Sequence, residues 1–118
     1  MEKKLYDSEL KIMEILWKQG ELTAKEIAET LHAQIGWSKT TTYTVIKKCI
    51  EKGAIERRDP HFICHALISK EEAQKYETDE LIEKLYDGSP DRLIAALLGD
   101  KKLDKAGIMR LKELIKDL

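Results

Sequence analysis

The sequence predicts a mainly α-helical fold that contains one small β-hairpin. Apolar residues recur with the helical period in six segments, and two short strand-like runs flank the turn-forming tripeptide Asp59-Pro60-His61. The chain has 118 residues, of which 42% are hydrophobic and 36% charged, as in one globular domain. No apolar run has the length of a transmembrane helix, and the first residues do not resemble a signal peptide. We therefore expect a cytoplasmic protein without membrane insertion.

The first half of the chain predicts three helices, over about residues 8–19, 23–33 and 38–52. Each begins at a residue whose side chain can cap a helix N-terminus, namely Ser8, Thr23 and Ser38. Strands are expected next, at 54–58 and 62–67. Three helices followed by a two-stranded hairpin is the order of a winged helix-turn-helix, with the helix-turn-helix at 23–52 and the wing at 55–67. In that architecture the third helix lies in the major groove of DNA.

Three further helices are predicted after the wing, capped by Ser69, Ser89 and Asp104. We therefore divide the chain into a winged-helix domain at 1–68 and a helical dimerisation region at 69–118. The last helix has apolar residues near heptad spacing, including Leu114 and Leu118, which is more apolar surface than a small domain needs. Packing of this surface onto the chain's own domain is the alternative. The residues predicted at a dimer interface are Leu81, Leu85, Leu93, Leu97, Ile108, Leu111 and Ile115.

The third predicted helix is unusual because it carries four threonines, a tyrosine and adjacent lysines, which are not chosen for helix propensity alone. If its apolar residues face the core, helical phase turns the hydroxyl groups outward, toward a ligand. Between residues 38 and 58 there are six cations and two anions, although the whole chain has a net charge of −1. This combination favours double-stranded DNA as the partner.

Each of these residues receives an expected role. Base edges would be contacted by Thr40, Thr41, Tyr43, Thr44 and Lys47, and the sugar-phosphate backbone by Lys39, Lys48, Arg57 and Arg58. Two other interpretations stay open: an exposed basic helix face can simply be solvated, and winged helices also serve as protein-protein interaction modules. A repressor relieved by a small-molecule ligand is compatible with the sequence as well, although no motif indicates a pocket.

Motifs for catalysis or metal binding are not found. The sequence contains no nucleophile with an adjacent base, no phosphate-binding glycine loop and no HExxH, so we expect neither an enzyme nor a cofactor. His61, Cys64 and His65 form an HxxCH pattern in the wing, but successive strand residues face opposite sides of a sheet. We therefore expect Cys64 inside the wing, His65 exposed and no metal site.

Three blocks of the sequence resemble the penicillinase-repressor family (BlaI, MecI and CopY type) of bacterial winged-helix transcription regulators. They are SELKIMEILWKQGELTAKEIAETL, WSKTTTYTVIKKCIEKGAIERR and RRDPHFICHALISKEE, in the family's order and spacing. The resemblance implies a homodimer that represses promoters by binding palindromic operators, often of resistance, β-lactamase or metal-homeostasis genes. It also implies dimerisation through the C-terminal helices.

The resemblance further suggests how repression could be relieved. In the β-lactam branch of the family, a membrane sensor protease signals, and the repressor is cut at an Asn-Phe bond in its dimerisation region. The matching stretch of this chain has Ala96-Leu97 at that place, so the inducing protease or sensor is left open. Copper-responsive relatives carry CxC motifs near the C-terminus, but this chain has no cysteine after Cys64.

Overall fold

The computed structural model describes residues 4–116, which form two compact units, one ending at Glu77 and the other beginning at Thr78. The elements of the first unit are α1 (Asp7–Gln19), β1 (Leu22–Thr23), α2 (Ala24–Ile35), α3 (Lys39–Glu51), β2 (Ile55–Arg58) and β3 (Ile63–Ala66). Helix α4 (Lys70–Leu85) begins in the first unit and ends in the second, where α5 (Pro90–Gly99) and α6 (Lys105–Ile115) follow. The mainly helical fold with a small antiparallel sheet is as predicted.

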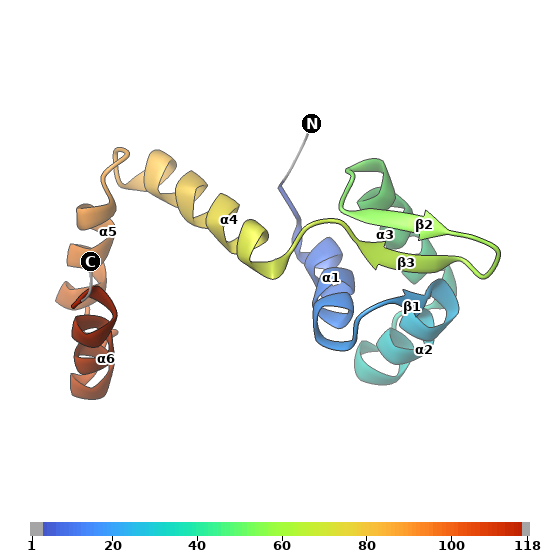
Figure 1. The fold of residues 1–118 in the computed structure, drawn as a ribbon, viewed down its shortest axis with the longest axis horizontal. Helices are drawn as coiled ribbons and strands as arrows, with labels where there is room; N and C mark the ends of the chain where they lie inside the picture. Colours follow the sequence, from blue (N-terminus) through green and yellow to red (C-terminus); the bar gives the residue numbers. More distant parts are fainter. Residues whose placement is uncertain (1–3, 117–118) are drawn as a thin grey trace. The chain divides into compact units, whose positions relative to one another are not determined.

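Three helices and a sheet enclose the core of the first unit (Figure 1). Fully buried side chains come from each of them, including Ile12 and Met13 of α1, Ile27 of α2, Ile46 of α3 and Cys64 of β3. Apolar positions three and four residues apart put one face of each helix inward. This core fixes the orientation of α3, and therefore determines which of its residues meet solvent.

The sheet has the strand order β1-β3-β2, with both pairs antiparallel. In the hairpin, Ile55 lies opposite Ala66 and Arg58 opposite Ile63. The predicted two-stranded wing is therefore present, but β1 adds a third strand through the pairing of Leu22 with Cys64. Its two residues are too few to show a strand period, so only the tertiary structure reveals it.

Capping residues predicted from the sequence begin most of the helices. Thr23 and Glu26 form the expected reciprocal capping box of α2, and Ser69 and Glu72 form that of α4. The predicted cap Ser8 is wrong, since α1 already begins at Asp7. Tyr6 is the N-cap residue of α1, and the Glu9 carboxylate accepts its backbone N–H at 2.8 Å.

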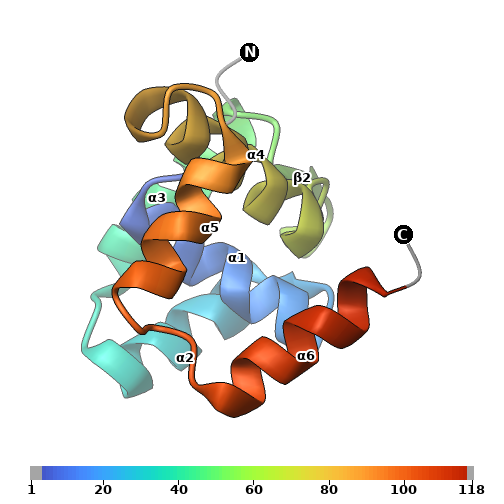
Figure 2. The same ribbon diagram turned by 90° about the vertical axis from the view of Figure 1, so that its left-hand side faces the viewer.

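In the second unit, α6 turns away from α5 after the connection 100–104 (Figure 2). Asp104 caps α6 as predicted, because its carboxylate accepts the Gly107 backbone N–H at 2.7 Å. Proline lies at the first position of α5 as predicted, but the predicted cap Ser89 makes no side-chain hydrogen bond to the helix backbone, and its hydroxyl donates to Asp91 Oδ1 at 2.7 Å. Leu118, which we expected on the apolar stripe of the last helix, lies outside the described residues.

Candidate nucleic-acid interface

The third helix begins with a hydrogen-bonded cap that also involves a candidate DNA contact. Ser38 Oγ accepts the Thr41 backbone N–H at 3.1 Å and donates to Thr41 Oγ1 at 3.0 Å. The Thr41 hydroxyl proton is then free to be donated outward, because the oxygen uses a lone pair for Ser38. The cap thus holds one hydroxyl of the exposed arc in a defined orientation.

Helix α3 exposes the arc that the sequence predicted. Lys39, Thr40, Thr41, Thr44, Lys47 and Lys48 are exposed, and Tyr43 is half-buried. Five of these residues line a shallow groove of about 380 Å³ along the outer face: Lys39, Thr40, Tyr43, Thr44 and Lys47. The groove brings hydroxyl groups and amines together on one helix face, as a surface that hydrogen-bonds a polar ligand requires.

One threonine departs from the expectation that the hydroxyls of this helix face outward. Thr42 is 0% exposed, and its Oγ1 has no hydrogen-bond partner. The reason is helical phase, since Thr42 precedes the buried Val45 and Ile46 by three and four residues. Thr42 therefore belongs to the core and not to the candidate interface.

The hydroxyl of Thr44 is engaged within the helix. Its Oγ1 donates to the Thr40 carbonyl oxygen at 2.9 Å, which leaves the lone pairs of Oγ1 to accept from a ligand. The exposed arc therefore offers a ligand a hydrogen-bond donor, the Thr41 hydroxyl, and an acceptor, the Thr44 hydroxyl oxygen. Amino and carbonyl groups on base edges in the major groove offer both kinds of partner.

The two wing arginines differ in how strongly the protein holds them. Arg58 contacts Glu56 and Glu21, with 2.6 Å between nitrogen and carboxylate oxygen in each case. The Glu56 hydrogen bond raises the pKa of Arg58, and the Arg58 hydrogen bond lowers the pKa of Glu56. Arg57 contacts only the exposed Asp59 among the described carboxylates, at 3.1 Å. Arg58 must therefore exchange two carboxylates for a phosphate, whereas Arg57 exchanges one.

Lys52, which we counted in the positive charge of this segment, does not belong to the interface. Its amine contacts Glu9 Oε1 and the Lys4 carbonyl oxygen, both at 2.7 Å, and it lies over the Tyr6 ring. The free cations of the arc are those on its outer face: within the described chain, no carboxylate lies within ion-pair distance of Lys39, Lys47 or Lys48.

Phe62 was expected at the start of a strand and was not among the predicted site residues. It lies before β3 with a φ of 51°, and its ring meets the Tyr43 ring edge to face at a centroid distance of 5.7 Å. The Phe62 ring makes a second contact with Arg57, whose guanidinium carbon lies 3.7 Å from the ring centroid. A lone aromatic residue at a turn is the only signal that the sequence carries for this junction of helix and wing.

The HxxCH pattern of the wing has a structural explanation. Cys64 is 0% exposed within the core, as predicted, while His65 lies half-exposed with its Nδ1 2.7 Å from Glu21 Oε1. The alternation of strand side chains separates the two residues. Among the described residues, no group of three histidines, cysteines or carboxylates converges on a point where a metal ion could bind.

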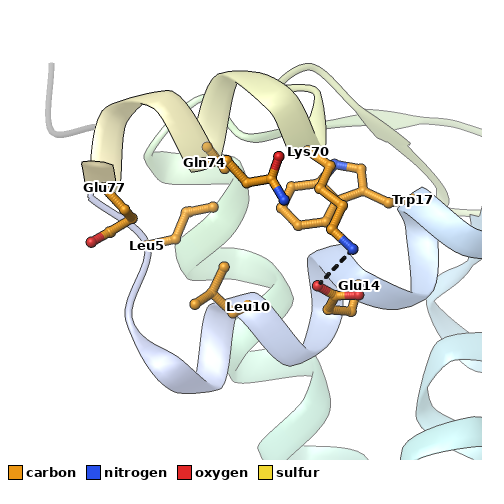
Figure 3. Close-up of a pocket in the computed structure, with 8 residues that line it drawn as sticks. Leu5, Leu10, Glu14, Trp17, Lys70, Gln74 and Glu77 are labelled. Carbon is orange, nitrogen blue, oxygen red and sulfur yellow. Dashed lines mark ion pairs between the residues drawn. The ribbon is translucent and has the colours of Figure 1, made fainter. Parts of the chain in front are cut away.

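A cleft of about 220 Å³ lies between α1 and the first turns of α4, within the first unit (Figure 3). Leu5 and Leu10 line one part of it, and Trp17 closes another. The Trp17 indole N–H donates to the Ile68 carbonyl at 2.9 Å, so the ring is fixed in place. Lys70 and Glu14 form an ion pair at its edge, at 3.7 Å. These contacts attach the beginning of α4 to the winged-helix core.

None of the described helices combines the length and the apolar character that crossing a membrane requires. The helix-turn-helix, the sheet and the exposed basic face of α3 define a winged-helix protein with the features of a DNA-binding module. Residues 5–117 match the family model described as penicillinase repressor. The chain belongs to the penicillinase-repressor family, whose members are DNA-binding transcriptional repressors and not enzymes.

Individual relatives agree with this assignment. The chain is 28% identical over 120 residues to the methicillin resistance regulatory protein MecI of Staphylococcus aureus (strain N315), covering 98% of each chain. It is 21% identical over 113 residues to the penicillinase repressor of Bacillus licheniformis, covering 94% of this chain and 88% of that one. The solution structure of the DNA-binding domain of the repressor BlaI superposes with a TM-score of 0.55 at 26% identity, covering 61% of this chain and 93% of the domain.

Proposed function

We propose that this protein represses transcription in the cytoplasm by binding a palindromic operator as a homodimer, with α3 of each protomer in the major groove. The observation that carries the proposal is the exposed arc of α3, where cations without carboxylate partners among the described residues accompany orientated hydroxyl groups. Two-fold symmetry of a dimer matches the symmetry of a palindromic site. Occlusion of a promoter by such a dimer would repress the genes behind it, and genes of resistance or stress responses are the expected class.

Within this proposal the residues of the arc divide by chemistry. Thr40, Thr41, Tyr43, Thr44 and Lys47 line the outer face of α3 and contact base edges, where hydroxyl and amine groups find distinct donor and acceptor patterns. Lys39 and Lys48 flank them and, with Arg57 and Arg58 of the wing, contact phosphates. Phosphate contacts fix the register of the protein on the duplex, and base contacts give the sequence preference.

The second unit supports the dimer. Helices α4 and α5 contain no buried residue, and the only buried residue of α6 is Gly107. Several of its large apolar side chains are strongly exposed in the single chain, such as Leu85 at 71% and Leu114 at 75%. The proposed interface consists of Leu81, Leu85, Leu93, Leu97, Ile108, Leu111 and Ile115, and we add the exposed Ile94, Leu98 and Met109. Exposed apolar surface of this kind is typical of a subunit interface.

The place where the resemblance puts the family's cleavage site lies in this second unit. Ala96 and Leu97 lie inside α5. A protease binds its substrate in an extended form, so cleavage there would require α5 to unwind. We propose that the inducer of this protein differs from the Asn-Phe cleavage that the resemblance suggested.

Selection of bound fragments from sheared genomic DNA of the source organism tests the proposal, at about 0.15 M salt, where nonspecific binding is suppressed. Enrichment of a few promoters that share an inverted repeat is the expected result. If no fragment is enriched and unrelated duplex DNA fails to displace a protein partner captured from lysate, the winged helix is an interaction module and the proposal is wrong.

Substitutions then separate the two classes of contact. Thr44→Ala should reduce discrimination between operator and scrambled duplex by ~1 to 3 kcal/mol, because an acceptor for a base is lost. The matched control is Thr30→Ala on α2, since Thr30 makes the same 2.9 Å hydrogen bond to a carbonyl four residues earlier.

Lys48→Ala should weaken binding to all duplexes alike and reduce the salt dependence by about one phosphate contact.

A further inference from the structure

Phe62 lies between the DNA-facing helix and the wing and contacts both. Its ring packs edge to face on Tyr43, with an interplanar angle of 88°. The Arg57 guanidinium stacks on it, 3.7 Å from the ring centroid. On the helix side the contact continues, because the Lys39 amine lies 5.6 Å from the Tyr43 centroid. Two candidate DNA contacts from two elements, Tyr43 and Arg57, are therefore connected through one aromatic ring that has no candidate DNA role itself.

The backbone of Phe62 holds this ring in place. Its carbonyl oxygen accepts the Ala24 N–H at 2.9 Å, which attaches the end of the wing loop to the start of α2. A φ of 51° puts Phe62 in the left-handed region, which a bulky residue without glycine's freedom adopts only where its surroundings enforce it. The conformation turns the chain from the loop into β3 while the ring faces α3. The strained backbone and the two ring contacts together hold the Phe62 ring between α3 and the wing.

We infer that Phe62 is a positioning residue that joins α3 and the wing into one DNA-contacting unit. This inference rests on the proposed function and goes beyond it, because it assigns the orientation of Tyr43 and Arg57 to a residue outside the binding arc. Without the ring, Arg57 keeps only its exposed contact with Asp59, and Tyr43 loses the ring against which it packs. Base contact and phosphate contact would then form independently of each other, each from a less ordered side chain.

A double-mutant cycle measures this connection directly. Tyr43→Leu, Arg57→Gln and the double variant are compared in three backgrounds: Phe62, Phe62→Leu and Phe62→Tyr. The probe is the duplex recovered by genomic selection, with a scrambled duplex of the same composition beside it, at fixed salt. In the Phe62 background, the double variant should bind roughly three- to tenfold more tightly than the product of the single losses predicts, because either substitution already breaks the unit.

The other backgrounds distinguish positioning from general stability. Phe62→Tyr keeps an aromatic face and should retain the coupling. In the Phe62→Leu background, the affinity losses caused by Tyr43→Leu and Arg57→Gln should instead multiply, as expected for independent residues. Leu67→Ala, which removes an exposed apolar side chain just after the end of β3, is the matched control and should leave the coupling unchanged. Thermal unfolding followed by the two tryptophans, at 17 and 37, verifies that each variant is folded.

Three outcomes are distinguishable. A wild-type protein that binds selected and scrambled duplexes equally would contradict the proposed function. If the wild-type protein prefers the selected duplex but the affinity losses of Tyr43→Leu and Arg57→Gln multiply in the Phe62 background, the inference is overturned while the proposed function stands. Coupling that is present with Phe62 and Phe62→Tyr and lost with Phe62→Leu would establish Phe62 as the residue that aligns helix and wing. If Phe62→Leu does not fold, the cycle in the Phe62 background still tests the inference, since an absence of coupling between Tyr43 and Arg57 there would overturn it.

Discussion

In the unit that ends at Glu77, three helices and a sheet enclose a continuous apolar core, whereas from Thr78 onward Gly107 is the only described residue that is buried. Both units are rich in leucine and isoleucine, so composition does not explain the difference. The first unit covers its apolar residues within one chain. The second leaves them exposed, as a subunit interface would be before assembly. The stability of the first unit should therefore be independent of concentration, and that of the second should depend on a partner.

The largest expected effect comes from placing charge on the exposed apolar stripe of the second unit. Leu111→Asp combined with Ile115→Asp should raise the dimer dissociation constant on the order of a thousandfold, because two apolar contacts are replaced by charges that assembly would have to desolvate. Sedimentation velocity should show a monomer, and operator binding should weaken in parallel. Thermal unfolding of the first unit, followed by tryptophan fluorescence, should not change.

Arg110→Asp on the same helix is the control, since Arg110 is exposed and helical phase places it opposite Ile108, Leu111 and Ile115. It changes the charge without changing the apolar face and should leave a dimer. A dimer of unchanged mass in the double variant would contradict the contrast between the two units and would move the interface to another part of the chain.

Removal of a charge partner should cost stability in the first unit and almost none in the second. Lys52→Ala leaves the Glu9 carboxylate, whose residue is 2% exposed, without its cation and should lower the free energy of unfolding by about 3 kcal/mol. Arg92→Ala removes the cation of an exposed pair with Asp87 and should change it by less than about 0.5 kcal/mol. Urea midpoints measure both. Equal losses would mean that the first unit is no better enclosed than the second.

The sequence predicted those features of the fold that depend on neighbouring residues. Ser38 could be identified as the cap of α3 because an N-cap acts within three residues, and its bond to the Thr41 N–H confirms it. The exposed arc of α3 could be predicted because helical phase relates it to Val45 and Ile46 in the same segment. Local periodicity therefore gave the winged helix and the candidate DNA residues together.

The remaining features depend on contacts between distant segments, and these the sequence does not display. Arg58 pairs with Glu21, which is 37 residues away, and Lys52 pairs with Glu9 at a separation of 43. From the sequence, Arg58 was interpreted as a DNA contact and Lys52 as part of the surface charge, because their carboxylate partners come from other elements. Phe62 was missed for the same reason, since its neighbours Tyr43 and Ala24 come from other parts of the chain.

Alkaline pH should destabilise the first unit specifically, because both cysteines of the chain lie there. Burial raises the pKa of Cys49 to about 12 and that of Cys64 to about 11, whereas the usual thiol value is about 9.0. Above pH 9 the unfolded chain releases thiol protons that the folded chain retains. The stability that these protons contribute is complete below pH 9 and is lost as pH rises toward 11 and 12.

Urea unfolding at pH 8.5 and pH 10 measures this loss. About 1 kcal/mol should be lost over that range through Cys49, and Cys49→Ala should reduce the loss accordingly. The thiols of the native protein should also resist a thiol reagent until urea opens the core, since the reactive thiolate is scarce. Rapid modification under native conditions would show that the core of the first unit opens more readily than its burial indicates.

The smallest effect concerns Thr42, which among the described residues of the first unit is the one buried hydroxyl without a hydrogen-bond partner. Thr42→Val replaces that hydroxyl with a methyl group of similar shape and should raise the free energy of unfolding by about 1 kcal/mol, because a buried polar group without a hydrogen bond is costly. Operator affinity should stay the same, since Thr42 faces away from the arc. Thr41→Val is the comparison: it lies on the exposed side of the same helix and should leave stability nearly unchanged while weakening discrimination. A loss of stability in Thr42→Val would indicate that the buried hydroxyl donates a hydrogen bond in solution, and the core would then be less apolar than its packing implies.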